Sequence, residues 1–215
     1  MNMHASWVKG AALASLVAAT ASAQVVVYEN STTPLNSFFE SRTEVGDEIT
    51  IGAGWIAHSF TFEYYGENLS GNETALVRFY RNDGVGVGPS SAPGSLMYES
   101  PGIPLINGNY PVSIVDLAGL NIALPNSFTW SVKVNGLADG ETFSLKMYDP
   151  PTVGSSFDDF WQFTADGWAL KQVDGLPVGA GSNFGATLIA VPEPGVMTLL
   201  GLGALAMFAR RRARA

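Results

Sequence analysis

The 215-residue sequence contains no cysteine. Disulfide bridges, thiol catalysis and cysteine-ligated zinc are therefore excluded, and the stability of a folded domain must come from its core. Histidine is almost as scarce, since only His4 and His58 are present. His58 lacks the second histidine expected of a metal site, and no Gly-x-Ser-x-Gly motif is present, so no Ser-His-Asp triad can be located.

Basic residues are few in the central part of the chain. Between residues 24 and 194, nineteen acidic side chains stand against six basic ones, an excess of thirteen negative charges. The whole-chain charge of −8 understates this excess, because the remaining basic residues lie at the two ends. Nucleic acid is excluded as a partner, because binding it requires a basic surface. The acidity instead favours solubility and an affinity for divalent cations.

The first 23 residues have the pattern of a secretory signal peptide. Lys9 supplies a short positive region, residues 10–20 form an apolar segment, and Ala21-Ser22-Ala23 provides a small-residue cleavage site. We expect cleavage after Ala23, with Ala21 and Ala23 as the recognition residues and Gln24 as the first residue of the exported protein.

The last 25 residues combine three parts. Pro192-Glu193-Pro194 precedes a fifteen-residue apolar run, residues 195–209, and the cluster Arg210, Arg211 and Arg212 follows it. The prolines cannot continue a helix and keep the chain extended. A helix that spans a membrane needs about 20 apolar residues, so this predicted transmembrane helix is short for a permanent anchor. The arginines would stay in the cytoplasm, which places the preceding domain outside it.

This tail, residues 191–215, resembles the PEP-CTERM sorting signal of Gram-negative bacteria that produce exopolysaccharide. The resemblance implies that an exosortase-type membrane protease recognises Pro192, Glu193 and Pro194 and removes the tail. The protein would then be held transiently at the inner membrane before it reaches the cell surface or the extracellular matrix. An ordinary membrane anchor or an amphipathic helix is the alternative interpretation. The resemblance implies nothing about the fold or activity of the rest of the chain.

Residues 24–190 predict one all-β domain. Apolar and polar residues alternate strictly along residues 128–134, which is typical of an antiparallel strand with one buried face. Asp166-Gly167 is the best candidate for a two-residue hairpin turn, whereas residues 85–94 are expected to form a long loop. This pattern predicts an antiparallel two-layer sandwich of jelly-roll type. Its expected strands cover residues 25–28, 48–51, 59–64, 75–80, 95–99, 112–115, 120–124, 128–134, 142–147, 159–163, 168–172 and 184–190.

Three stretches of this domain are similar to sandwich domains found in PEP-CTERM proteins, namely residues 45–51, 77–84 and 159–161. The likeness assigns no catalytic residue.

Carboxylates gather in the last third of the domain. Asp149, Asp158, Asp159 and Asp166 would supply the oxygen ligands that calcium prefers. No EF-hand or nonapeptide calcium motif is present, so a solvated acidic loop is the alternative. Calcium is the only cofactor that these sequence patterns indicate.

Aromatic residues accompany these acids. Trp161 and Trp168, with Tyr148 and Phe163, are candidates for contact with a glycan, because exposed aromatic rings stack on sugar rings. The alternative is that alternating aromatics lie in the core, as we expect for Trp130.

Together these patterns predict an exported, non-enzymatic β-sandwich protein of the cell surface or matrix with a structural or adhesive role. A carbohydrate-binding module for the exopolysaccharide matrix is the alternative. A secreted glycan hydrolase is a third candidate, but it would need two facing carboxylates, and no motif singles out such a pair.

Overall fold

The structure is a computed structural model that describes residues 23–87, 90–174, 176, 181–193 and 195. The described residues form an all-β fold in which every strand pairing is antiparallel. Most of the predicted signal peptide, including Ala21, lies outside them. So does most of the predicted sorting tail, including Pro194, Arg210, Arg211 and Arg212.

Within these ranges, no helix has both the length and the apolar character needed to cross a membrane.

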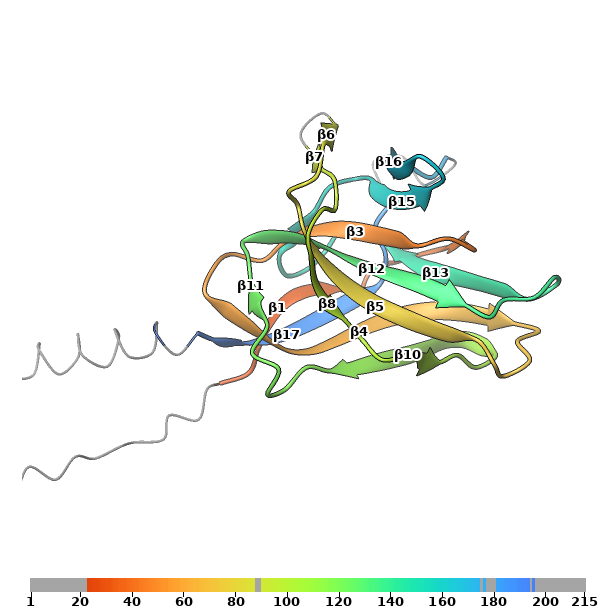
Figure 1. Cartoon of the computed structure of the whole chain (residues 1–215), viewed down its shortest axis with the longest axis horizontal. Coiled ribbons are helices and arrows are strands. Elements are labelled where there is room, and N and C mark those ends of the chain that lie inside the picture. The colour runs from red at the N-terminus through yellow and green to blue at the C-terminus, as the bar shows by residue number, and fades with distance from the viewer. Residues whose placement is uncertain (1–22, 88–89, 175, 177–180, 194, 196–215) are drawn as a thin grey trace, which may run out of the picture.

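The first of two large sheets has seven strands. Five of them follow one path of neighbours, while the other two pair with the free edge of the longest strand (Figure 1). The path runs β1 (Val25–Asn30), β17 (Ala186–Pro192), β4 (Trp55–Glu67), β13 (Thr142–Tyr148) and β2 (Pro34–Glu40), and the edge strands are β10 (Gly108–Asp116) and β11 (Ala123–Leu124).

The second sheet has eight strands, six of them on one path. The path runs β16 (Gly167–Lys171), β15 (Phe160–Thr164), β3 (Val45–Thr50), β12 (Ser127–Asn135), β5 (Thr74–Arg81) and β8 (Leu96–Glu99). The two short strands β14 (Ser155–Ser156) and β9 (Ile103–Pro104) pair with β3 and β5.

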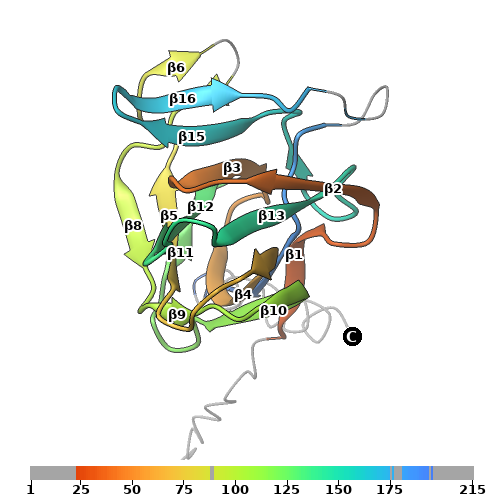
Figure 2. The same ribbon diagram turned by 90° about the vertical axis from the view of Figure 1, so that its right-hand side faces the viewer.

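The two sheets pack face to face on an aromatic core (Figure 2). Phe60 of β4 lies with its ring centroid 5.0 Å from Trp130 of β12 and 5.4 Å from Phe79 of β5. All three side chains are fully buried. They come from strands in which every second residue is apolar, so one face of each sheet is buried against the other. The predicted core position of Trp130 is confirmed.

The region predicted as a long loop, residues 85–94, contains a small hairpin instead. Its strands are β6 (Gly86–Val87) and β7 (Ser90–Ser91). The Asp83 carboxylate closes the loop at its base, because it accepts hydrogen bonds from the backbone N–H and the hydroxyl of Ser95.

The predicted hairpin at Asp166-Gly167 is present, shifted by one residue. Thr164 pairs with Gly167, so Ala165 and Asp166 form the turn, and Gly167 opens β16 with a φ of 101°. This φ favours glycine.

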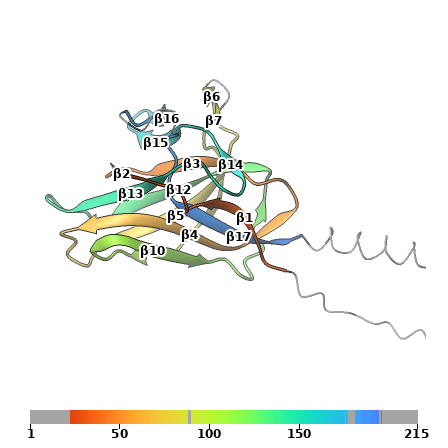
Figure 3. The ribbon, with the colours of Figure 1, turned by 180° about the vertical axis from the view of Figure 1, so that it is seen from behind.

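The first and last strands of the domain are neighbours. Val25 pairs with Ala190, and Figure 3 shows β1 and β17 side by side. The last strand continues two residues past residue 190, the predicted end of the domain: Pro192 pairs with Trp55, and the N–H of Glu193 donates to the carbonyl of Gly54 at 2.9 Å. We call this end of the sandwich, where the chain leaves through Glu193, the tail end.

Candidate functional site

The hairpin β15–β16 curls over the outer face of the second sheet. The ring of Trp168 on β16 meets the ring of Tyr80 on β5 edge to face, with 5.6 Å between centroids. Three strands, β15, β3 and β12, separate these residues along the sheet. In a flat sheet the two strands would lie about 19 Å apart. Figure 2 shows β15 and β16 beyond β3, at one edge of the second sheet.

The curled hairpin encloses a groove of about 710 Å³, which we call the aromatic groove. Its apolar wall contains Trp168, Phe163 and Tyr80, and its polar wall contains Glu44, Arg78 and Lys133. Trp168 also packs edge to face on Phe163, with 5.3 Å between centroids. Phe163 is 46% exposed, so part of this wall is open to a ligand.

Glu44 is the centre of the polar wall. Its carboxylate accepts hydrogen bonds from Arg78 Nη1 at 2.6 Å, from the Tyr80 hydroxyl at 3.0 Å and from the Ser131 hydroxyl at 2.6 Å. Arg78 also forms an ion pair with Glu99 at 2.6 Å. Arg78 and Tyr80 face outward because their neighbours Val77 and Phe79 occupy the inner face of β5.

These contacts fix the protonation states in the groove. Burial raises the pKa of Tyr80 to about 12, and the Glu44 charge adds to this effect, so the hydroxyl remains a donor at neutral pH. Burial lowers the pKa of Arg78, but the charges of Glu44 and Glu99 outweigh that effect and raise it overall. The wall therefore presents fixed hydrogen-bond donors.

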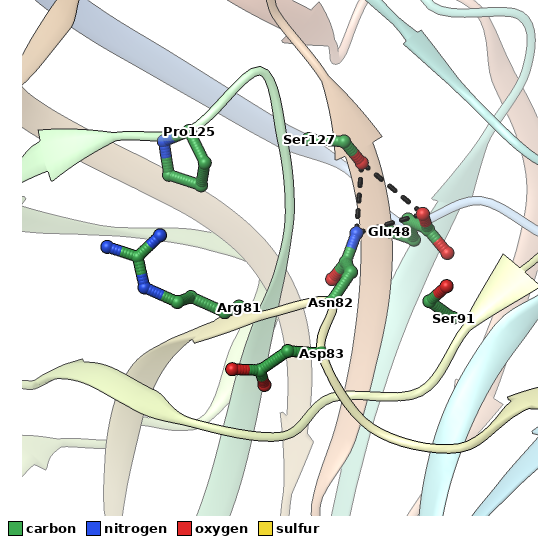
Figure 4. A pocket seen from close by; sticks show the side chains of 7 residues that line it. All are labelled: Glu48, Arg81, Asn82, Asp83, Ser91, Pro125 and Ser127. Atoms are coloured by element: carbon green, nitrogen blue, oxygen red, sulfur yellow. Dashed lines mark hydrogen bonds between the residues drawn. The ribbon is translucent and has the colours of Figure 1, made fainter.

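A smaller pocket of about 390 Å³ lies further along the same face, around Glu48 (Figure 4). Asn82 Nδ2 donates to Glu48 Oε1 at 2.8 Å and to the Ser127 hydroxyl at 2.9 Å. Glu48 Oε2 has no hydrogen-bond partner among the described residues. Burial raises the pKa of Glu48, although the hydrogen bonds of Ser127 and Asn82 oppose the shift. Figure 4 shows Arg81 on the side of Pro125, away from this carboxylate.

The two tryptophans predicted to contact a glycan have different environments in the structure. Trp168 is half-buried and lines the aromatic groove. Trp161 is fully buried, so the expectation that its ring meets a glycan is corrected. Its neighbour Phe160 is also buried, which means that β15 is covered on both faces at this point. Tyr148 is buried too, and its hydroxyl donates to Glu63.

The four candidate calcium ligands are only partly brought together. The oxygens Asp158 Oδ1 and Asp149 Oδ1 both lie near Gly181. Asp159 is half-buried, and its pKa is raised by burial and by the charge of Asp158. Asp166 lies in the hairpin turn at the opposite end of β15. Among the described residues, no three His, Cys, Asp or Glu side chains are grouped as a metal site.

Sequence reasoning missed Glu44, Arg78, Tyr80 and Lys133 as site residues. The alternation of residues 75–80 does place Arg78 and Tyr80 on an outward face. The sequence contains no signal, however, that a distant hairpin covers that face. His58 lies half-buried on β4, in the other sheet.

Residues 190–213 match the family model of the PEP-CTERM protein-sorting motif. The predicted sorting signal is thus confirmed over these residues, and it implies export, membrane-associated sorting and processing by exosortase. No curated protein and no solved structure matches the chain.

Proposed function

We propose that the PEP-CTERM protein-sorting motif delivers a non-enzymatic, adhesive β-sandwich to the cell surface or extracellular matrix, where its aromatic groove binds a glycan. The observation that carries this proposal is the pairing of an aromatic wall, Trp168 and Phe163, with a fixed polar wall around Glu44 and Arg78. The ligand we propose is the exopolysaccharide matrix itself.

The two walls match the two kinds of surface on a sugar ring. The C–H face of a sugar packs on an aromatic ring, whose face is electron-rich. The hydroxyl groups around the ring need donors and acceptors at fixed positions, as in other sites where a few polar groups orient a ligand. Arg78 and Lys133 supply donors on the polar wall.

The groove extends along the second sheet from the tail end. Ser127 pairs with Thr50, close to Gly54 and the tail end, whereas Lys133 lies six residues further along β12. Six residues of strand span about 20 Å. Tyr80 pairs with Thr129, only two residues from Ser127, so the groove begins near the tail end and extends to the far part of the sheet.

The carboxylates of this face support binding rather than hydrolysis. The carboxylate of Glu44 is occupied by three donors, Arg78, Tyr80 and Ser131. A general acid or nucleophile would need to be free to react.

A jelly-roll connectivity belongs to the same proposal. It is supported by the neighbour orders β2–β13–β4–β10 in the first sheet and β3–β12–β5–β8 in the second, in which strands close in sequence lie in opposite sheets.

Glycan binding is tested by screening the purified full chain in detergent on an array that includes exopolysaccharide from a strain with the exosortase system. We expect Trp168→Ala to weaken binding at least about tenfold, as for loss of a central aromatic anchor. Phe38→Ala is the matched control, since Phe38 is an exposed aromatic that does not line the groove.

Equal binding by both variants would place the glycan elsewhere. Turnover of the bound glycan, measured by release of reducing ends, would show instead that the protein is a hydrolase.

A further inference from the structure

Three charged side chains line the aromatic groove, and the protein neutralises them to different extents. Glu44 and Arg78 form an ion pair at 2.6 Å. Arg78 forms a second ion pair with Glu99, which does not line the groove and whose side chain is 41% exposed to solvent. The cations of the ion pairs among the described residues are Arg78 and Lys146, so Lys133 has no carboxylate partner there. The groove therefore contains an ammonium group whose counter-ion has to come from a ligand or from solvent.

The acidic neighbour of Lys133 is already engaged by other donors. The register of β12 and β3 places Lys133 beside Glu44. Glu44 Oε2 accepts a hydrogen bond from Arg78, and Oε1 accepts hydrogen bonds from the hydroxyls of Tyr80 and Ser131. Both carboxylate oxygens are thus occupied, and the Arg78 guanidinium offsets their charge. The positive charge of Lys133 remains available at the surface of the groove.

Lys133 and the exposed ring of Phe163 lie on opposite sides of Glu44. The N–H of Phe163 donates to the carbonyl oxygen of Glu44 at 2.8 Å, so β15 and β12 flank β3 at this level. Neighbouring strands are about 4.8 Å apart, which separates the backbones of β15 and β12 by about 10 Å. A sugar ring that packs on Phe163 would extend the substituents of its edge across Glu44 toward Lys133. The flexible four-carbon stem of the lysine adjusts the position of its ammonium group.

We propose that the aromatic groove selects an acidic glycan, in which a carboxylate such as that of a uronic acid binds Lys133 while its sugar ring packs on the aromatic wall. The proposal rests on the proposed function, because it names the class of glycan that the same groove would take. A carboxylate and an ammonium group form a charge-assisted hydrogen bond, which is roughly twice as strong as one between neutral groups. A neutral sugar offers only hydroxyl groups to the same ammonium.

The charge of the whole domain limits how acidic this glycan can be. Between residues 24 and 194, acidic side chains outnumber basic ones by thirteen, so a densely charged polyanion would be repelled. At physiological ionic strength the Debye length is about 8 Å, so distant surface charges act only weakly on a single carboxylate in the groove. We therefore expect a glycan with widely spaced carboxylates rather than a heavily sulfated or phosphorylated one.

The test compares two forms of one exopolysaccharide from a strain with the exosortase system. One is the native polymer, and in the other the carboxyl groups have been reduced to primary alcohols with carbodiimide and borohydride. We expect the purified full chain in detergent to bind the native form about tenfold more tightly, measured by calorimetry. Lys133→Gln should bind both forms as weakly as the wild type binds the reduced form. Lys133→Arg should retain the preference, because it keeps the positive charge.

Lys171→Gln is the control, because Lys171 is an exposed lysine of the same hairpin that does not line the groove. It should keep the wild-type preference for the native polymer. An equal loss of preference in Lys133→Gln and Lys171→Gln would show only a general effect of surface charge and would overturn the proposal.

The same measurements separate this proposal from the glycan-binding function on which it rests. Equal affinity of the wild type for both polymers would overturn the selection of acidic glycans. Glycan binding by the groove would still stand in that case if Trp168→Ala weakened the binding of both polymers. Absence of wild-type binding to either polymer would overturn the proposed function as well.

Discussion

Trp168 rests its ring edge-to-face against that of Tyr80, 5.6 Å away, although three strands lie between them in the second sheet. This contact shows that the sheet is not flat at this end. Its terminal hairpin turns back over the sheet and converts a polar outer face into the aromatic groove. The candidate site therefore depends on the curl of one hairpin as much as on the residues that line it.

Removing the indole of Trp130 should destabilise the domain severely. Trp130 is fully buried and its ring centroid lies 5.0 Å from that of Phe60 on the opposite sheet. We expect Trp130→Ala to lower the free energy of unfolding by about 3–5 kcal/mol, measured by denaturant titration. Val85→Ala is the control, because Val85 is 86% exposed and its truncation should cost almost nothing. A loss below about 1 kcal/mol for Trp130→Ala would contradict the core assignment.

A methyl group at residue 46 should not fit. A Cβ on Gly46 would lie 2.6 Å from the carbonyl oxygen of Trp130 and 2.9 Å from Ser131 Cβ, on the neighbouring strand β12. The strands would have to move apart, so we expect Gly46→Ala to cost about 1–3 kcal/mol in the same titration.

Gly102→Ala is the control for this substitution, because its Cβ would meet only the side chain of Thr74, at 3.4 Å or more. If both alanine variants unfold at the wild-type denaturant concentration, the close approach of β3 and β12 at residue 46 is wrong.

The buried carboxylate of Asp47 should make the domain less stable as pH rises. Burial raises the pKa of Asp47 well above its ordinary value, and the charges of Asp159 and Glu48 add to this effect, while hydrogen bonds from Ser156 and from the N–H of Phe184 oppose it. The folded state thus holds the proton more tightly than the unfolded state. Stability should fall as pH rises from about 4, the ordinary aspartate value, through the raised folded pKa.

Asp47→Asn should reduce this slope, because the amide has no proton to lose and still has an oxygen that accepts a hydrogen bond. The raised pKa values of Glu48 and Asp159 contribute the part that remains. The measurement is the free energy of unfolding between pH 4 and 8. Asp139→Asn, an exposed turn residue, should leave the wild-type slope unchanged. A slope in Asp47→Asn equal to that of the wild type would assign the whole pH dependence to other carboxylates.

The motif Pro192, Glu193 and Pro194 should direct processing, while the apolar run after it only holds the chain in the membrane. Replacing all three residues with alanine should leave the protein uncleaved in the inner membrane, which cell fractionation and intact mass would show. Deleting residues 195–215 should instead release the domain without sorting. Arrival of the triple-alanine protein at the surface with its tail removed would rule out the motif as the recognition element.

The structure adds one constraint to this processing. Pro192 pairs with Trp55, and the N–H of Glu193 is bonded to Gly54, so the first two residues of the motif are held against the folded domain. We therefore expect the protease to act close to the domain surface or after the end of β17 has separated from β4.

Local sequence patterns were sufficient to predict a strand where one of its faces is buried. Residues 128–134 and 142–147 alternate because their inward side chains fill the core, and both were predicted as strands. The strand β2 was not predicted, for the opposite reason. It is an edge strand that begins with Pro34, contains Asn36 at a φ of 56°, and has no fully buried residue, so it carries no apolar period.

The sequence by itself determined the antiparallel β class, the sorting motif and the absence of thiol chemistry, because each depends only on residue type and spacing. The tertiary structure alone decided which tryptophan faces a groove and which is covered. Trp161 and Trp168 lie in similar alternating runs, but β15 is buried on both faces at Trp161, whereas the curl of the hairpin brings Trp168 onto Tyr80. The meeting of Asp149 and Asp158 near Gly181 likewise follows from the packing of distant loops. Such juxtapositions depend on long-range contacts, which local alternation does not encode.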